Sequence, residues 1–311
     1  MLKKIFFVSR AFPFSLVIYP GSGPEFGEAY GWEVRYLDEM ARTTCDIGIV
    51  ENRLREGDLD ILEHFLSAPS GVRYPIFFKV SDPDMPASPH RSTRYVFEQK
   101  DRPGVHYLSV YDPIGPAGDF FASLSASRVV RAPFPYDVRR EVDRPIAGRS
   151  RQVFVSGARS RRLYPFRESV FRRFTINPIA RSALARLPHP GYPDIGGTLR
   201  HTVIRDKYVE YAAHYTHFLL DPSRYGVELM KYTECAYAGS VPVGMIPRSL
   251  SSTVAHCFLG SNCRTLELLR TVRMPIDEME AIANAYRGAL RVARDPARLN
   301  TELDDQISRL L

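Results

Sequence analysis

Two short apolar runs, joined by a helical stretch, constrain the fold of this chain more than any other feature. Residues 217–220 and 241–246 are apolar and suit buried parallel strands. Good helix formers fill residues 227–238 without a break, and Gly239 stands where a left-handed helix cap belongs. The order strand, loop, helix, glycine turn, strand predicts a parallel sheet with crossover helices, and therefore an α/β fold.

A carboxylate falls early in that predicted helix. In open α/β sheets, ligands bind at the carboxyl ends of the strands. Glu234 is about one turn into the helix that follows such an end, where its carboxylate is placed to accept hydrogen bonds from vicinal sugar hydroxyls. The alternative is an ordinary crossover helix in which Glu234 is only solvated.

The run from Lys231 to Val243, KYTECAYAGSVPV, resembles the carboxy-domain signature of glycosyltransferases with two Rossmann-like domains, the GT-B architecture. The resemblance implies that Glu234 holds the ribose or sugar of a nucleotide-sugar donor and that the turn after Gly239 closes the pocket. Retaining members often have a second glutamate eight positions earlier, where this chain has Gly226. Inverting and retaining transfer therefore both stay open.

The positive charge of the chain is concentrated in one stretch. The formal net charge is +7, and residues 139–173 hold eleven arginines against three acids. Within this stretch, residues 152–157 suit a strand, and Arg159 and Arg161 precede a helix that begins near Pro165. Guanidinium groups at a helix amino terminus suit a diphosphate, which is also the contact that the resemblance implies here.

Candidates for binding the donor therefore come from both ends of this second half. They are Gly157, Arg159, Arg161, Arg167, Lys231, Tyr232, Glu234 and Gly239. Arg159, Arg161 and Arg167 are assigned to the diphosphate. In addition, His189-Pro190 is similar to the pair through which some sialyltransferases and related enzymes bind a cytidine nucleotide.

Transfer to a hydroxyl with inversion requires a group that takes up the acceptor's proton. Carboxylates follow the predicted strands at residues 3–9 and 74–81, and functional side chains are common at such strand ends, although carboxylates also cap turns there. The candidates for the base, in order, are Glu25 or Glu28, then Asp82 or Asp84, then His90.

The most linker-like part of the chain, rich in prolines and charges, is residues 133–151. We predict a boundary near residue 145, with an acceptor domain over 1–145 and a donor domain over 146–311. The expected fold is α/β, with two Rossmann-like domains facing across a cleft. The resemblance also implies that the last predicted helix, residues 300–311, crosses back to the first domain.

Two further elements are predicted in the first domain. Apolar residues recur at helical spacing over residues 28–42, which indicates a helix. Residues 95–99 are rich in strand formers and indicate a short strand.

Composition limits the compartment and the cofactors. Hydrophobic residues make up 44% of the chain, enough for two cores. The four cysteines show neither disulfide density nor metal-ligand spacing, which suits a reducing compartment. No segment resembles a signal peptide or a membrane span. We expect a cytoplasmic protein without a metal or a cofactor, whose basic charge also suits loose attachment to the inner face of a membrane.

These features predict a metal-independent glycosyltransferase that moves a sugar from a nucleotide-sugar donor to a hydroxyl acceptor, such as a glycan or a lipid-linked saccharide. Arginines would stabilise the leaving diphosphate. One alternative is a protein that binds polyanions or nucleic acid through residues 139–173. That stretch has few interleaved aromatics, so we expect no specific nucleic-acid partner. Another alternative is a sugar-nucleotide epimerase of the same architecture.

Overall fold

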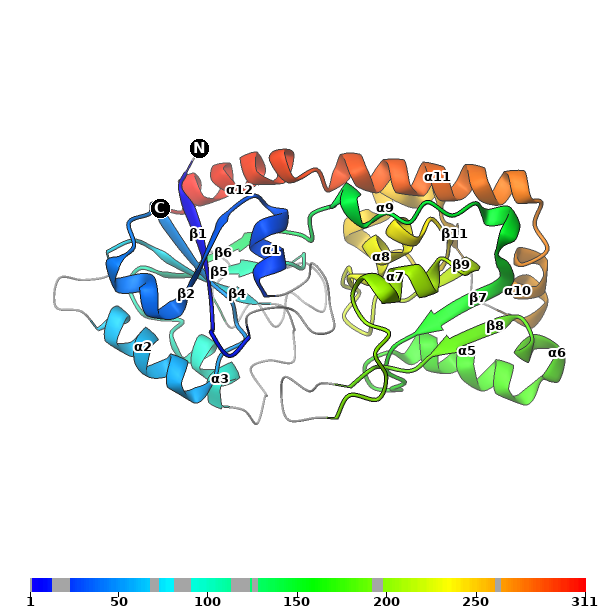
Figure 1. Ribbon diagram of the computed structural model, residues 1–311, viewed down its shortest axis with the longest axis horizontal. Coiled ribbons are helices and arrows are strands. Elements are labelled where there is room, and N and C mark those ends of the chain that lie inside the picture. Colours follow the sequence, from blue (N-terminus) through cyan, green and yellow to red (C-terminus); the bar gives the residue numbers. More distant parts are fainter. Residues whose placement is uncertain are drawn as a thin grey trace. The chain divides into compact units, whose positions relative to one another are not determined.

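The computed structural model divides into two compact units, Met1–Pro135 with Arg294–Leu311 and Tyr136–Ala293 (Figure 1). No helix in the described part of the chain is long and apolar enough to cross a membrane. The structure describes residues 2–12, 23–67, 73–80, 91–112, 124, 128–191, 198–260 and 264–311.

The first unit is built on a fully parallel sheet in the order β2-β1-β3-β4-β5-β6. Its strands are β1 (Lys4–Val8), β2 (Glu33–Tyr36), β3 (Ile47–Val50), β4 (Ile76–Val80), β5 (Val105–Ser109) and β6 (Val129–Arg131). Its helices are α1 (Pro24–Ala29), η1 (Leu37–Arg42), α2 (Glu56–Leu66), α3 (Arg91–Glu98) and α12 (Pro296–Leu310). Every residue of β1, β3 and β4 is buried, as central strands covered on both faces require.

The terminal helix α12 packs on the sheet of this first unit, as the resemblance implies (Figure 1). Trp32 Nε1 donates a hydrogen bond to Asn300 Oδ1 at 2.6 Å. Lys4 Nζ lies 2.5 Å from Asp304 Oδ1. Both pairs are partly or fully buried, so they fix the helix against β1 and the start of β2.

Two predicted elements of the first unit are wrong. The predicted helix at residues 28–42 is instead the end of α1, strand β2 and the short helix η1. Gly31 breaks the helix at a positive φ of 74°, and the rings of Tyr30 and Trp32 stack at 4.3 Å across the turn. The predicted strand at residues 95–99 lies in and just after α3, because a short apolar run does not distinguish a strand from one buried face of a helix.

The second unit has a parallel sheet in the order β11-β10-β9-β7-β8. Its strands are β7 (Ser150–Ser156), β8 (Leu184–Leu187), β9 (Tyr215–Leu220), β10 (Val241–Gly244) and β11 (Leu259–Gly260). Its helices are η4 (Val138–Arg140), η5 (Ile146–Gly148), α5 (Pro165–Ile176), α6 (Pro178–Arg181), α7 (Asp206–Ala212), α8 (Lys231–Ala238), α9 (Arg248–Val254), η7 (Ala255–Cys257), α10 (Thr265–Thr271) and α11 (Ile276–Ala293).

Helices cover both faces of this second sheet. Val153 and Val155 of β7 share a core with residues of α5, α10 and α11. Between them, Phe154 points to the other face, where its ring lies 5.9 Å from that of Tyr208 on α7. The alternation along β7 therefore places α5 and α7 on opposite sides of the sheet.

Both sheets have the same winding. When strands are numbered within each unit, both sheets contain the order 2-1-3-4-5, which is a doubly wound order. The direction in which successive strands are added to the sheet reverses between the first and third strands. Ligands bind at the carboxyl ends of the strands at this reversal. In the second unit the reversal lies between β7 and β9. The loop that contains Arg159 and Arg161 follows β7, and Asp221 follows β9.

Candidate functional site

A glycine at the end of β7 makes room for two cations. Gly157 has a positive φ of 97°, which few residues other than glycine adopt. A Cβ atom at this position would lie 2.9 Å from Arg167 Nη1 and 3.3 Å from Lys231 Cε. Gly157 therefore lies against the guanidinium of Arg167, which comes from α5, and against the side chain of Lys231, which comes from α8. A larger residue at this position would clash with both.

Arg167 is 2% exposed, although it is charged. Its Nη1 donates to the carbonyl oxygen of Ala158 at 3.2 Å, and its Nε lies 3.8 Å from Asp221 Oδ2. Its Nη2 is buried and has no hydrogen-bond partner in the described part of the chain. Buried donors are nearly always paired, so the guanidinium has capacity for one more acceptor.

Asp221, directly after β9, holds Arg167 in place. Its Oδ2 also accepts a hydrogen bond from the backbone N–H of Arg167 at 3.2 Å, and its Oδ1 accepts one from the N–H of Ser223 at 2.9 Å. Burial raises the pKa of Asp221, and the charge of Arg167 opposes that rise. Both oxygens of the Asp221 carboxylate thus bind groups of the protein itself, and the carboxylate orients Arg167.

Lys231 is the first residue of α8, and its amine reaches back to β7. Nζ donates to Ser156 Oγ at 2.8 Å and to the Tyr208 hydroxyl at 3.1 Å. Burial lowers the pKa of Lys231, the charge of Glu234 opposes this, and the charge of Arg167 lowers it further. The two cations therefore repel each other in a poorly solvated place, and a bound anion would relieve that repulsion.

Glu234 lies one turn into α8 and is 7% exposed. No residue among those described donates a hydrogen bond to its carboxylate. Burial raises the pKa of Glu234, and the charge of Lys231 only partly offsets this. A buried carboxylate that lacks donors is suited to accept hydrogen bonds from a ligand's hydroxyl groups.

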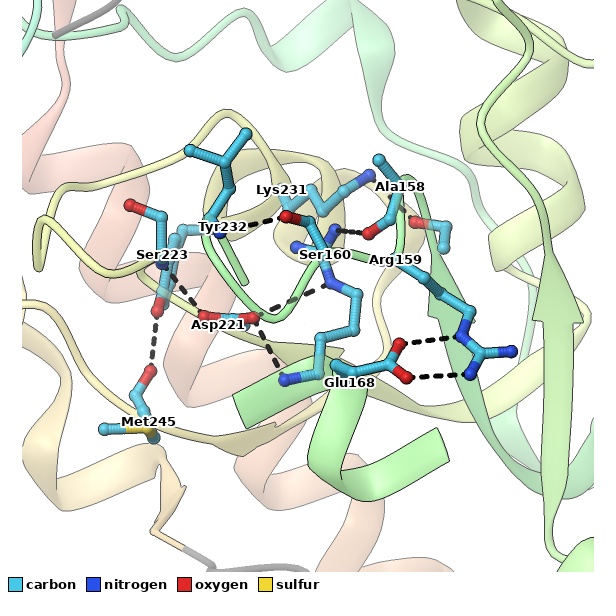
Figure 2. A network of polar contacts seen from close by, with 12 residues as sticks. Ala158, Arg159, Ser160, Glu168, Asp221, Ser223, Lys231, Tyr232 and Met245 are labelled. Atoms are coloured by element: carbon cyan, nitrogen blue, oxygen red, sulfur yellow. Dashed lines mark hydrogen bonds and ion pairs between the residues drawn. The ribbon is translucent and has the colours of Figure 1, made fainter. Parts of the chain in front are cut away.

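Arg159 and Arg161 follow Gly157 in sequence, and Arg159 has a partner of its own. Arg159 forms a bidentate pair with Glu168, with Nε–Oε2 and Nη2–Oε1 distances of 2.8 Å each (Figure 2). Its guanidinium also lies over the Phe171 ring at 5.2 Å. Arg161 is exposed. The structure thus brings Arg167 to Gly157 and Lys231, and turns Arg159 to the outer side of α5.

Two other predicted donor residues have structural partners. Tyr232 is fully buried, and its hydroxyl donates to the Met245 carbonyl at 2.6 Å (Figure 2). Gly239 caps α8 at a φ of 59°, where a Cβ atom would run into the guanidinium of Arg287. Because α8 runs antiparallel to the strands, Gly239 lies at the edge of the sheet opposite to Lys231.

The predicted bases belong to the first unit. Glu25 is buried and Glu28 is exposed, both on α1. Asp82, Asp84 and His90 lie outside the described residues.

The sequence did not single out a buried ion pair at the carboxyl edge of the first sheet. Glu51 follows β3, and its Oε2 lies 3.3 Å from Lys79 Nζ, with both side chains almost fully buried. Glu51 Oε2 also accepts the N–H of Gly23 at 2.8 Å, which fixes the start of α1. Its position directly after a strand was the only signal that sequence reasoning could have used.

His189 lies in the loop after β8 and is neutral in the folded protein. The N–H of Gly191 donates to its Nδ1 at 3.0 Å. Burial lowers the pKa of His189 to about 4, and the nearby charge of Lys231 contributes to this shift. The loop after β8 thus approaches the same cations as the loop after β7.

Within the part of the chain that the structure describes, no group of three or more histidine, cysteine, aspartate and glutamate side chains is arranged to hold a metal ion.

This chain has the fold of GT-B glycosyltransferases, in which two Rossmann-like units are joined in one chain. Among solved structures, Anabaena HepE in complex with UDP and glucose is similar over 99% of this chain and 100% of its own, with a TM-score of 0.57 and 11% identity. Sucrose-phosphate synthase from Thermosynechococcus elongatus is similar over 99% of both chains, with a TM-score of 0.57 and 10% identity.

A third similar structure is a UDP-forming trehalose-phosphate synthase from Burkholderia xenovorans. It has a TM-score of 0.54 and 12% identity, and the similarity covers 100% of this chain and 99% of that one. No protein-family model matches the chain, and no curated protein matches its sequence. At these identities the likeness shows the fold alone.

Proposed function

We propose that the protein is a glycosyltransferase that moves a sugar from a nucleotide-sugar donor to a hydroxyl acceptor. The observation that supports this most is the proximity of buried Arg167 and half-buried Lys231 at Gly157, at the reversal point of the second sheet. Two cations held together, one with a buried donor still unpaired, match a diphosphate. Glu234, one turn further along α8, matches sugar or ribose hydroxyls.

In the proposed reaction the anomeric carbon–oxygen bond breaks and the nucleoside diphosphate leaves as an anion. Arg167 and Lys231 stabilise the charge that develops on the leaving oxygen, without a metal or a further cofactor. The acceptor hydroxyl forms the new bond, and its proton passes to a base. Glu25, Glu28, Asp82 and Asp84 remain the candidates for that base, and the stereochemistry of transfer stays open.

The acceptor side of the proposal rests on the first unit. A glycan or a lipid-linked saccharide is the proposed acceptor class, with the protein working in the cytoplasm or against the inner face of a membrane. The solved structures of HepE hold UDP, UDP with glucose, or UDP-glucose, which supports a UDP-sugar as the first donor to test.

A nucleotide panel tests the donor class directly. A ligand that binds only the native protein raises its free energy of unfolding, by about 2.7 kcal/mol at a hundredfold excess over Kd. This gain raises the melting temperature by several degrees. Among UDP, GDP, dTDP and CMP, we expect one diphosphate, UDP first, to give such a shift and CMP to give none. Shifts from inorganic pyrophosphate as large as those from every nucleotide would contradict a nucleotide site.

Product analysis with and without an acceptor then separates sugar transfer from epimerisation.

The pH dependence of UDP binding tests the role of Glu234. Its pKa is raised by burial, and hydroxyl donors favour the ionised carboxylate, so binding should release a proton. UDP affinity should therefore fall as pH drops through the raised pKa, which lies above the ordinary value of about 4.3. The comparison with Glu234→Gln, measured by calorimetry from acid to neutral pH, removes the titration of UDP itself. A ratio of affinities that stays constant with pH would exclude this role.

A further inference from the structure

Three arginines lie near one carboxylate of α5, and a fourth shares an aromatic ring with one of them. Glu168 accepts the two hydrogen bonds from Arg159, and the charges of Arg159, Arg172 and Arg161 all lower the pKa of Glu168. Arg186, on the edge strand β8, lies over the Phe171 ring at 5.1 Å, close to the 5.2 Å of Arg159. We call Arg159, Arg161, Arg172 and Arg186 the α5 arginine cluster.

This cluster has more positive charge than it can neutralise. Glu168 is the only acidic residue between positions 151 and 191, and it is already paired with Arg159. Arg161, Arg172 and Arg186 are exposed, and no described carboxylate pairs with any of them. These three charges come from the loop before α5, from α5 itself and from β8, and together they form a local field that favours an anionic surface.

An apolar side chain extends the same face. Ile176 is 80% exposed and lies one turn beyond Arg172 at the end of α5. None of the large hydrophobic residues exposed in the described parts is aromatic, whereas proteins that bind single strands of nucleic acid stack bases on aromatic rings. Arginines flanked by an exposed aliphatic side chain fit instead the headgroup layer of an anionic bilayer.

We propose that the α5 arginine cluster is a docking surface for anionic phospholipid membranes. The surface uses other residues than the donor site, because Asp221 holds Arg167 beside Gly157, whereas Glu168 holds Arg159. Arg159 is only two residues after Gly157, so docking would bring the donor site close to a lipid-linked acceptor. That last consequence rests on the proposed function, whereas membrane binding itself does not.

The experiment is sedimentation of the full chain with vesicles of phosphatidylcholine alone or with about one-third phosphatidylglycerol. We expect binding only to the anionic vesicles, and we expect it to vanish between about 0.1 M and about 1 M salt, as the Debye length falls from about 10 Å to about 3 Å. Arg172→Glu with Arg186→Glu should weaken the partition coefficient by about thirtyfold or more. Arg172→Gln with Arg186→Gln should weaken it less.

The matched control is Arg298→Glu with Arg309→Glu, which changes the net charge equally but on exposed positions of α12. This variant should bind vesicles within about twofold of the wild type. Equal losses in both variants, no binding to anionic vesicles, or tighter binding to duplex DNA at the same salt would each overturn the proposal. UDP affinity should be unchanged in the cluster variants, so failure here is distinguishable from failure of the proposed function.

Discussion

Replacing Lys231 with methionine is expected to lower kcat for sugar transfer by about 10² to 10³, the usual effect of removing one donor from a developing anion. Methionine keeps most of the volume of the lysine stem but loses the charge beside Gly157. It also removes the Lys231 charge that opposes the rise in the pKa of Glu234, so that pKa should rise further. The measurement is steady-state transfer at saturating donor, with UDP affinity determined alongside.

Arg161→Met provides the control for Lys231→Met, since it also removes one positive charge close in sequence to the donor loop. Arg161 is exposed and belongs to the α5 arginine cluster, so kcat and UDP affinity should change little. If Arg161→Met were as damaging as Lys231→Met, the sequence-based assignment of Arg161 to the diphosphate would be favoured over the site around Gly157.

The part of the site on α8 could be predicted from the sequence because it depends on local order. Lys231 and Glu234 are separated by three positions on one helix, and a helix after a parallel strand starts at the carboxyl edge of the sheet. The glycine turn and the following strand fixed the direction of the chain. These relations hold within about thirty residues and need no tertiary contact.

The roles of the arginines could not be predicted in the same way. Arg159 and Arg167 are eight positions apart, and which of them faces the end of β7 depends on partners elsewhere. Asp221, 54 positions after Arg167, draws that arginine inward, while Glu168 holds Arg159 outside. A count of charges identifies the basic stretch, but only the packed structure shows that Arg167 faces inward and Arg159 faces outward.

The same limit explains the misread region after α1. The spacing of apolar residues over 28–42 fits a helix, and it also fits a short strand followed by a turn of 3-10 helix. Pairing of β2 with β1 and the stacking of Tyr30 on Trp32 decide between them. Both are contacts of the folded sheet, and the one local signal was the position of Gly31.

Arg167→Met should destabilise the protein and weaken donor binding together, and a second substitution should separate the two effects. Removing the arginine leaves Asp221 buried without its charge partner, a change that typically costs about 3 to 5 kcal/mol. In Arg167→Met with Asp221→Asn neither member of this buried pair is charged, so more than half of that loss should return. The asparagine oxygen can keep only one of the two backbone hydrogen bonds that Asp221 accepts, so recovery should be incomplete.

UDP affinity should stay about a hundredfold below the wild type in both variants, because a charge-assisted hydrogen bond to the diphosphate contributes about 1.5 to 3 kcal/mol and neither variant restores it. Denaturant unfolding measures the first effect and calorimetric titration the second. If affinity returned together with stability in the double variant, Arg167 would be a structural residue only. The anion would then have to be held by Lys231 without it.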